Sequence, residues 1–169
     1  MPETDLARAR ECDPAAFERL VTPLLPGLFG FLRRRLGQGA EDAYQETLLA
    51  AWRAVGGFAG HSSVKTWLYA IAGYKCADAL RKRGREPKTV EAGDALAAEP
   101  FEEGSLERMD LKAAVSTLKP EDRSLIFLVY SQGFGLREAA ETLGISEGTA
   151  KSRLHALRKR LRTSLGGKG

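Results

Sequence analysis

The chain is poor in the residues that build disulfide frameworks and metal centres. Its 169 residues include two cysteines, Cys12 and Cys76, and two histidines, His61 and His155. Neither cysteine has metal-ligand spacing around it, so we expect no disulfide framework, no metal site and no cofactor. Isolated cysteines are more often inert than redox-sensing, and the inert interpretation is favoured for both.

Long apolar segments are also scarce. The N-terminus is charged and lacks the apolar core that is typical of a signal peptide. No apolar run approaches the roughly 20 residues that are needed to cross a bilayer. We therefore expect a cytoplasmic protein without membrane insertion.

Strand patterns and catalytic signatures are missing as well. No stretch alternates convincingly between apolar and polar residues, whereas helical periodicity dominates. No glycine-rich phosphate loop follows a strand, and periodicity supports no pairing of a nucleophile with a base. The sequence predicts an all-α protein that is not an enzyme.

Acidic residues are absent from the C-terminal end, where none follows Glu147. Residues 1–84 hold 12 basic and 9 acidic side chains, a net charge of +3, and residues 108–169 hold 12 and 6, a net charge of +6. Residues 85–107 between them hold 2 and 7, a net charge of −5. Two basic blocks around an acidic spacer indicate two DNA-facing modules. Glycine and proline punctuate the spacer and large apolar residues are few, which predicts a flexible linker.

Helix signals follow one another along both blocks. Asp13-Pro14 is a good helix start, and Pro23 and Pro26 are expected to split or bend that helix. Further helices are predicted over residues 28–36, 40–55, 64–83, 109–118 and 120–131. In the helix over 40–55, a buried stripe is predicted from Tyr44, Leu48, Trp52 and Val55.

Residues 136–161 predict two helices joined by a tight turn. The first ends at Leu143, Gly144 supplies the left-handed turn residue, and Ser146 is a good N-cap for the second. The second helix is loaded with lysine and arginine, which is the outline of a helix-turn-helix that reads a DNA major groove. Core spacing assigns Leu154, Leu157 and Leu161 to the interior. The candidate contacts to bases and phosphates are Ser146, Glu147, Thr149, Lys151, Ser152, Arg153, His155 and Arg158.

Three segments together resemble one family. Residues 42–53 read DAYQETLLAAWR, residues 63–72 read SVKTWLYAIA, and residues 146–161 read SEGTAKSRLHALRKRL. In this order and around a short linker, they resemble the extracytoplasmic-function (ECF) sigma factors of bacteria. The resemblance implies a dissociable subunit that directs core RNA polymerase to promoters. It implies a region 2 domain over 1–84, a flexible linker over 85–107 and a region 4 helix-turn-helix domain over 108–169.

The resemblance also assigns roles to residues of the first domain. The polar face formed by Asp42, Gln45, Glu46 and Arg53 would dock on the clamp helices of the polymerase β′ subunit, although a merely solvated helix face has the same pattern. The loop over 58–63 and the next helix would read the −10 element, because opened bases need aromatic faces and hydrogen-bonding groups. For Lys65 and Tyr69, packing within the helical bundle is an equal alternative. The full −10 set is His61, Ser62, Ser63, Lys65, Tyr69, Tyr74, Lys75 and Arg81.

The same resemblance implies partners. The second domain would read the −35 element of promoter DNA and grip the flap of the polymerase β subunit, and an anti-sigma factor would hold both domains inactive. The acidic linker would either imitate RNA in a polymerase channel or serve as a plain tether. The alternative function is a stand-alone helix-turn-helix regulator, in which Gln45, Glu46 and the segment 66–69 would have no role.

Overall fold

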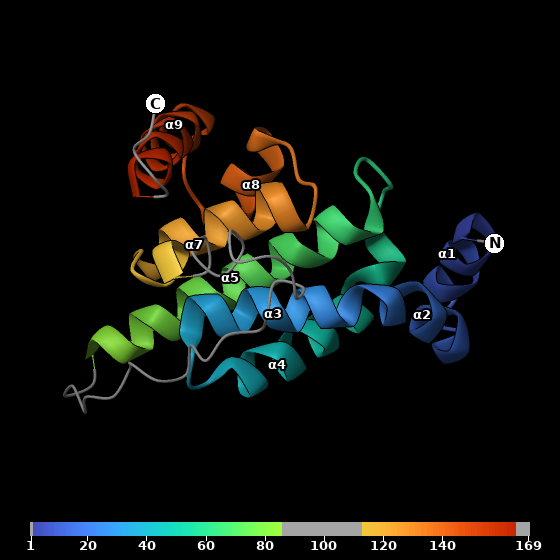
Figure 1. Ribbon diagram of the computed structural model, residues 1–169. Coiled ribbons are helices and arrows are strands. Elements are labelled where there is room, and N and C mark those ends of the chain that lie inside the picture. Colours follow the sequence, from blue (N-terminus) through green and yellow to red (C-terminus); the bar gives the residue numbers. More distant parts are fainter. Residues whose placement is uncertain (1, 86–112, 165–169) are drawn as a thin grey trace.

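Every regular element of the described chain is a helix (Figure 1). The computed structural model describes residues 2–85 and 113–164. The N-terminal module comprises α1 (Pro2–Arg10), α2 (Pro14–Val21), η1 (Thr22–Leu24), α3 (Leu25–Leu36), α4 (Ala40–Ala54), η2 (Val55–Gly57) and α5 (Val64–Arg85). The C-terminal module comprises α7 (Pro120–Ile126), the π-helical η4 (Phe127–Ser131), α8 (Leu136–Leu143) and α9 (Glu147–Ser164).

The prediction of an all-α fold in two helical modules is confirmed for these residues. Residues 113–116 are also helical, in agreement with the helix that was expected over 109–118. The first four residues of that helix, and residues 86–107 of the expected linker, lie outside the described residues.

Local sequence signals set the helix ends. Asp13 Oδ1 accepts hydrogen bonds from the backbone N–H groups of Ala15 and Ala16 at 3.0 and 3.3 Å, so it caps α2 as predicted. Pro23 lies in the tighter turn η1, after which α3 starts at Leu25, three residues before the predicted start. The first N–H groups of a helix have no intrahelical partner, so proline at these positions removes no helical hydrogen bond. The chain therefore continues with little interruption.

The buried side of α4 differs from the predicted stripe. Its most deeply buried residues are Ala40, Ala43, Thr47 and Ala51, whereas Tyr44, Leu48 and Trp52 are half-buried. Val55, which follows α4 directly, is buried as predicted. Small side chains allow α4 to approach α3 and α5 closely, and the larger ones fill the margins of the contact. The buried hydroxyl of Thr47 has a hydrogen-bond partner, because it donates to the Ala43 carbonyl oxygen at 2.6 Å.

Helix α1 was not predicted. It packs against α2, where Arg19 and Asp5 form an ion pair at 2.8 Å. It also reaches η2, and the guanidinium of Arg10 lies 5.9 Å from the centre of the Phe58 ring. Only Leu6 and Ala9 of α1 contribute to a small apolar cluster, so its periodicity is too weak to read from sequence.

Among the described residues, one segment, Pro14–Leu36, is long and apolar enough by length and composition to cross a membrane, contrary to the sequence-based expectation. It is not uniform, because the 3₁₀ turn η1 separates α2 from α3. On α3, Leu28, Phe31 and Leu32 are fully buried in the protein core. The segment therefore contributes the buried side of α3 to the core and does not point to a membrane protein.

The two modules close on each other. In Figure 1, α7 and α8 lie above α3 and α5, and α4 lies below them. Helix α8 packs on α5 and α7 packs on α3, so one apolar core runs through both modules. The rings of Phe31, Tyr69 and Phe134 form a chain across the boundary, with centroid separations of 5.8 and 5.0 Å.

Candidate nucleic-acid interface

The turn before α9 has the geometry that the sequence predicted. Gly144 has a φ of 72°, and Ser146 Oγ accepts a hydrogen bond from the Thr149 N–H at 3.1 Å. Ala150, Leu154 and Leu157 are buried. These contacts hold one side of α9 against the module and leave the other side free.

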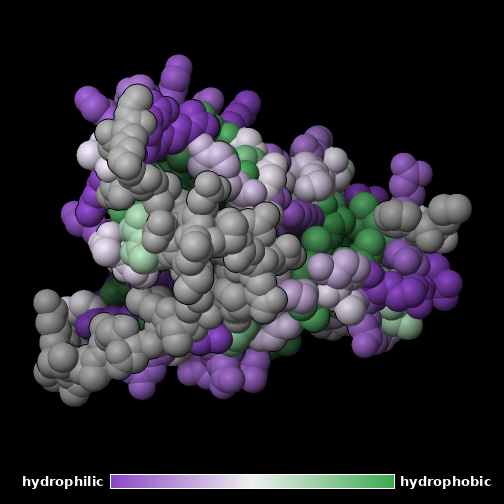
Figure 2. All heavy atoms as spheres, viewed as in Figure 1, coloured by the Kyte–Doolittle hydropathy of each residue, from purple (hydrophilic) through white to green (hydrophobic). Residues whose placement is uncertain are grey.

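The free side of α9 carries the predicted −35 contacts. Figure 2 shows hydrophilic side chains gathered over this helix. A helix with an exposed basic face presents lysine and arginine to phosphates and base edges without any rearrangement. All the predicted residues are exposed: Ser146, Glu147, Thr149, Lys151, Ser152, Arg153, His155 and Arg158.

Arg158 has a partner that could not be predicted from the sequence. Its Nε donates to the hydroxyl of Tyr130 on η4, and its guanidinium lies 5.6 Å from the centre of the Tyr130 ring. Tyr130 is itself 55% exposed. The pair orders the arginine on the surface. The two residues are 28 positions apart in the sequence, so no helical pattern predicts the contact.

The outer face of α4 carries the predicted polymerase contacts. Asp42, Gln45, Glu46 and Arg53 are all exposed. Leu49, which was not among the predicted contacts, lies among them and is 48% exposed. The spacing 42, 45, 46, 49 and 53 follows one helix face, and this pattern would have revealed Leu49. The result is a polar surface with an apolar side chain at its centre.

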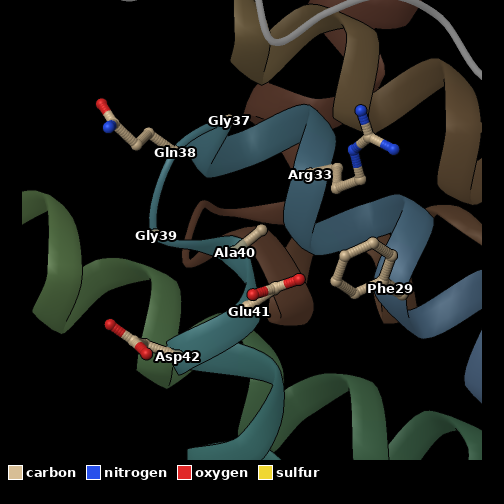
Figure 3. A pocket seen from close by; sticks show the side chains of 8 residues that line it. All are labelled: Phe29, Arg33, Gly37, Gln38, Gly39, Ala40, Glu41 and Asp42. Atoms are coloured by element: carbon tan, nitrogen blue, oxygen red, sulfur yellow. The ribbon is translucent and has the colours of Figure 1, made fainter.

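Two open hollows flank this face. One of about 440 Å³ lies beside the turn between α3 and α4, where Figure 3 shows the side chains of Phe29, Arg33 and Glu41 around it. The other, of about 330 Å³, lies between α4 and α5 and is lined by Glu46 and Lys75 among others. Asp42 lines both. Lys75, predicted as a −10 contact, therefore lies beside the α4 face.

Within the described parts of the chain, no three histidine, cysteine, aspartate or glutamate side chains come together in a group that could hold a metal ion.

The loop before α5 presents His61, Ser62 and Ser63 to solvent. Gly60 turns the chain there with a φ of 83°. Ser63 Oγ accepts a hydrogen bond from the Thr66 N–H at 3.0 Å, so Ser63 is the N-cap of α5 as well as a surface residue. The cap fixes the direction in which the loop leaves the helix.

The remaining −10 candidates divide between two environments. Tyr74 is 76% exposed, and Arg81 is exposed and paired with Asp78. Tyr69 is completely buried against the C-terminal module, and this burial raises the pKa of its hydroxyl. Lys65 is half-buried, and burial lowers the pKa of its ammonium group. Tyr69 packs between the rings of Phe31 and Phe134 in this arrangement.

Two family models match the two modules. Residues 20–86 match Sigma-70 region 2, and residues 108–161 match Sigma-70 region 4. The chain is 32% identical over 135 residues to the ECF RNA polymerase sigma factor SigM of Mycobacterium tuberculosis, covering 80% of this chain and 68% of that protein. It is 35% identical over 133 residues to SigL of the same species, with coverages of 75% and 74%.

Solved structures agree with this result. The sigma factor RpoE of Bartonella quintana, in its complex with the anti-sigma factor NepR, matches with a TM-score of 0.71 and 32% identity. The match covers 90% of this chain and 98% of that one. CnrH, in complex with the cytosolic domain of CnrY, matches at 23% identity with a TM-score of 0.63, which supports the fold. The chain belongs to the ECF family of RNA polymerase sigma factors.

Proposed function

We propose that this sigma factor binds core RNA polymerase through the outer face of α4. Asp42, Glu46 and Arg53 offer charges of both signs, which fix the register of a docking helix more than they add affinity. Leu49 adds an apolar anchor that a facing helix can bury. The clamp helices of the β′ subunit are the partner that family membership suggests.

The opened −10 element is the proposed ligand of the loop over 58–63 and of α5. His61 and Ser62 offer hydrogen bonds at the loop, and Tyr74 offers an exposed aromatic face on which a base can stack. Arg81 supplies phosphate contacts, which add affinity but carry no sequence information.

The −35 element is the proposed ligand of α9. Its exposed basic side, with no acidic residue after Glu147, is the observation that carries this proposal. Lys151 and Arg153 lie in its first two turns, where a recognition helix meets base edges. A good bidentate contact discriminates between bases by roughly 1–3 kcal/mol.

The remaining parts of the proposal follow from the family. The domain limits are 1–84, 85–107 and 108–169, and the protein acts in the cytoplasm without catalytic activity of its own. The flap of the polymerase β subunit contacts the C-terminal module. The complex of RpoE with NepR supports an anti-sigma factor as a further partner.

Reconstitution with core polymerase tests the proposal. The chain and core enzyme together should give transcripts that begin at defined positions, and sequencing of the bound DNA should reveal two separated elements. A chain that binds DNA as a dimer and never binds core enzyme would instead be a stand-alone regulator.

A matched pair of lysine variants tests the −35 assignment. Lys151→Ala removes a charge from the second turn of α9, whereas Lys159→Ala removes the same charge from an exposed position two turns further along. Lys151→Ala should weaken recognition of the upstream element while binding of core enzyme is kept. Equal effects of the two variants on sequence preference would contradict the assignment.

A further inference from the structure

The end of α1 reaches the loop that precedes α5. In Figure 1, α1 lies at the end of the molecule where α5 begins, and α1 contacts η2 just before the loop. Arg10 is the last residue of α1, and its backbone carbonyl oxygen lies 3.6 Å from the position that a Cβ at Gly56 would take. The chain turns away directly afterwards, because Cys12 has a φ of 68° and Asp13 caps α2. Arg10 is therefore fixed beside the start of the loop over 58–63.

The side chain of Arg10 also lies along this loop. Its guanidinium carbon lies 5.9 Å from the centre of the Phe58 ring, and Phe58 in turn packs against Trp67 with ring centroids 4.8 Å apart. Its Nη2 lies 3.4 Å from the position of a Cβ at Gly60, the left-handed residue directly before His61. Phe58 is buried and Arg10 is exposed, so a fixed ring holds a guanidinium at the surface next to the proposed −10 reader.

Arg10 differs from the other arginines of α1 and α2 in having no acidic partner among the described residues. Arg8 pairs with Asp13 at 2.9 Å. Arg19 pairs with Asp5 at 2.8 Å. An arginine that rests on a ring uses the face of its guanidinium, so the N–H donors at the edge remain available to an anion. Within the described chain, Arg10 is therefore an unneutralised cation at the rim of the loop.

A phosphodiester of the opened strand fits this group. A base that leaves its stack keeps the phosphates on either side of it, and these lie at the rim of the pocket that takes the base. A guanidinium binds phosphate oxygens through two parallel hydrogen bonds, which are charge-assisted and strong. Such a contact positions the strand without reading its sequence. Helix α1 precedes residues 20–86, so it lies outside the part of the module that matches Sigma-70 region 2.

We propose that Arg10 binds a backbone phosphate of the opened −10 strand, next to the base that the loop over 58–63 receives. This inference rests on the proposed function of that loop. Helix α1 thereby becomes part of the DNA interface, and the contact with Phe58 orders the guanidinium before DNA arrives. An ordered side chain loses less conformational freedom on binding, so this contact contributes more than a freely moving surface arginine would.

The test measures how tightly the chain in complex with core polymerase, the holoenzyme, binds a promoter fragment. The fragment comes from a promoter that the holoenzyme selects, and mismatches open its −10 element. Arg10→Ala should weaken binding about tenfold, the loss expected for one charge-assisted contact. It should also lower the slope of log Kd against log salt by about 0.7, as the loss of one single-strand phosphate contact requires.

Arg8→Ala is the matched control for Arg10→Ala. It removes the same charge from the same helix, at a position where Asp13 already neutralises that charge. Its binding should stay within about twofold of wild type, as for other exposed ion pairs. Equal losses in the two variants would show that only the net charge of α1 matters, and would overturn the proposal.

Arg10→Lys separates a phosphate contact from a packing role. Lysine keeps the charge but has neither the planar fork nor the flat face that rests on a ring. This variant should restore the salt dependence of wild type and only part of its affinity. If its salt dependence equals that of Arg10→Ala, the arginine acts through packing and the proposal is overturned.

Methylphosphonate substitution locates the contact on the DNA. The phosphates of the −10 strand are replaced one at a time by neutral methylphosphonates, and wild-type binding should weaken beside the captured base. At one of these positions the replacement should have no effect on Arg10→Ala, because both changes remove the same contact. Additive losses at every position would overturn the proposal.

The outcomes separate this inference from the proposed function. If wild-type holoenzyme makes no promoter-specific transcript, the proposed function fails. If transcripts form but Arg10→Ala binds the opened promoter as wild type does, only the role of Arg10 is overturned. If Arg10→Ala instead weakens binding of core enzyme by the same factor, Arg10 belongs to the polymerase interface, and its role in DNA binding is again overturned.

Discussion

Leu49→Ala is expected to weaken binding of core polymerase while leaving the fold intact. Full burial of a leucine side chain contributes about 1.5–3 kcal/mol. Leu49 is 48% exposed, so a docking partner can cover about half of its surface. The variant should therefore lose about 1 kcal/mol of binding free energy, or roughly fivefold in Kd.

The neighbouring leucine is the control. Leu48 is half-buried and packs against the apolar core, so Leu48→Ala should destabilise the fold by about 2 kcal/mol. Leu49→Ala should change the free energy of unfolding by less than about 0.5 kcal/mol, as surface substitutions do. The two variants remove the same atoms from adjacent positions of one helix and differ in the side that they face.

Two assays separate these effects. Fluorescence anisotropy of labelled chain titrated with core enzyme gives the Kd, and urea unfolding gives stability. The reasoning is refuted if Leu49→Ala binds core enzyme as tightly as wild type. It is also refuted if Leu49→Ala unfolds as readily as Leu48→Ala, because Leu49 would then be a core residue.

The remaining predictions concern stability and reactivity. Burial raises the pKa of the Cys76 thiol to about 11, so alkylation at pH 8 should label the exposed Cys12 and spare Cys76 in the folded chain; equal labelling of both by mass spectrometry would contradict this. Leu154→Ala empties a buried position of α9 and should cost about 2–5 kcal/mol in urea unfolding, whereas a negligible cost would place Leu154 outside the core. The backbone N–H of Ala16 holds the pKa of Asp13 below its ordinary value of 3.8, so the cap stabilises the fold above that pH and loses its effect as the pH falls through the lowered pKa. The difference in thermal midpoint between wild type and Asp13→Ala should therefore be present at pH 7 and vanish in acid, and a difference that persists at low pH would contradict the role of the charge.

Much of the fold could be predicted because its signals are local. The cap at Asp13, the left-handed Gly144 and the cap at Ser146 each act within four residues, so spacing alone reveals them. Helix α1 was not predicted because it buries few apolar residues. The most deeply buried side of α4 was not predicted because it consists of alanine and threonine, which carry a weak hydropathy signal. These residues lie at the closest approach of the helices.

The candidate site was predicted in the same uneven way. The exposed side of α9 could be read from sequence, because buried leucines at helical spacing fix which residues face outward. The partner of Arg158 could not, because Tyr130 lies 28 residues away. Lys65 and Tyr69 were left between two roles, because their surroundings come from a different module.

By itself, the sequence determined the helices, the basic recognition helix and the family, since periodicity, caps and charge are properties of neighbouring residues. Only the tertiary structure decided that α5 lies against α8, with donors on one helix meeting acceptors that follow 63 to 72 residues later. Complementarity between surfaces so far apart along the chain depends on shape and on the closeness that Gly73 permits. No periodic pattern in either segment predicts this contact, because the contact depends on the shapes of both surfaces together.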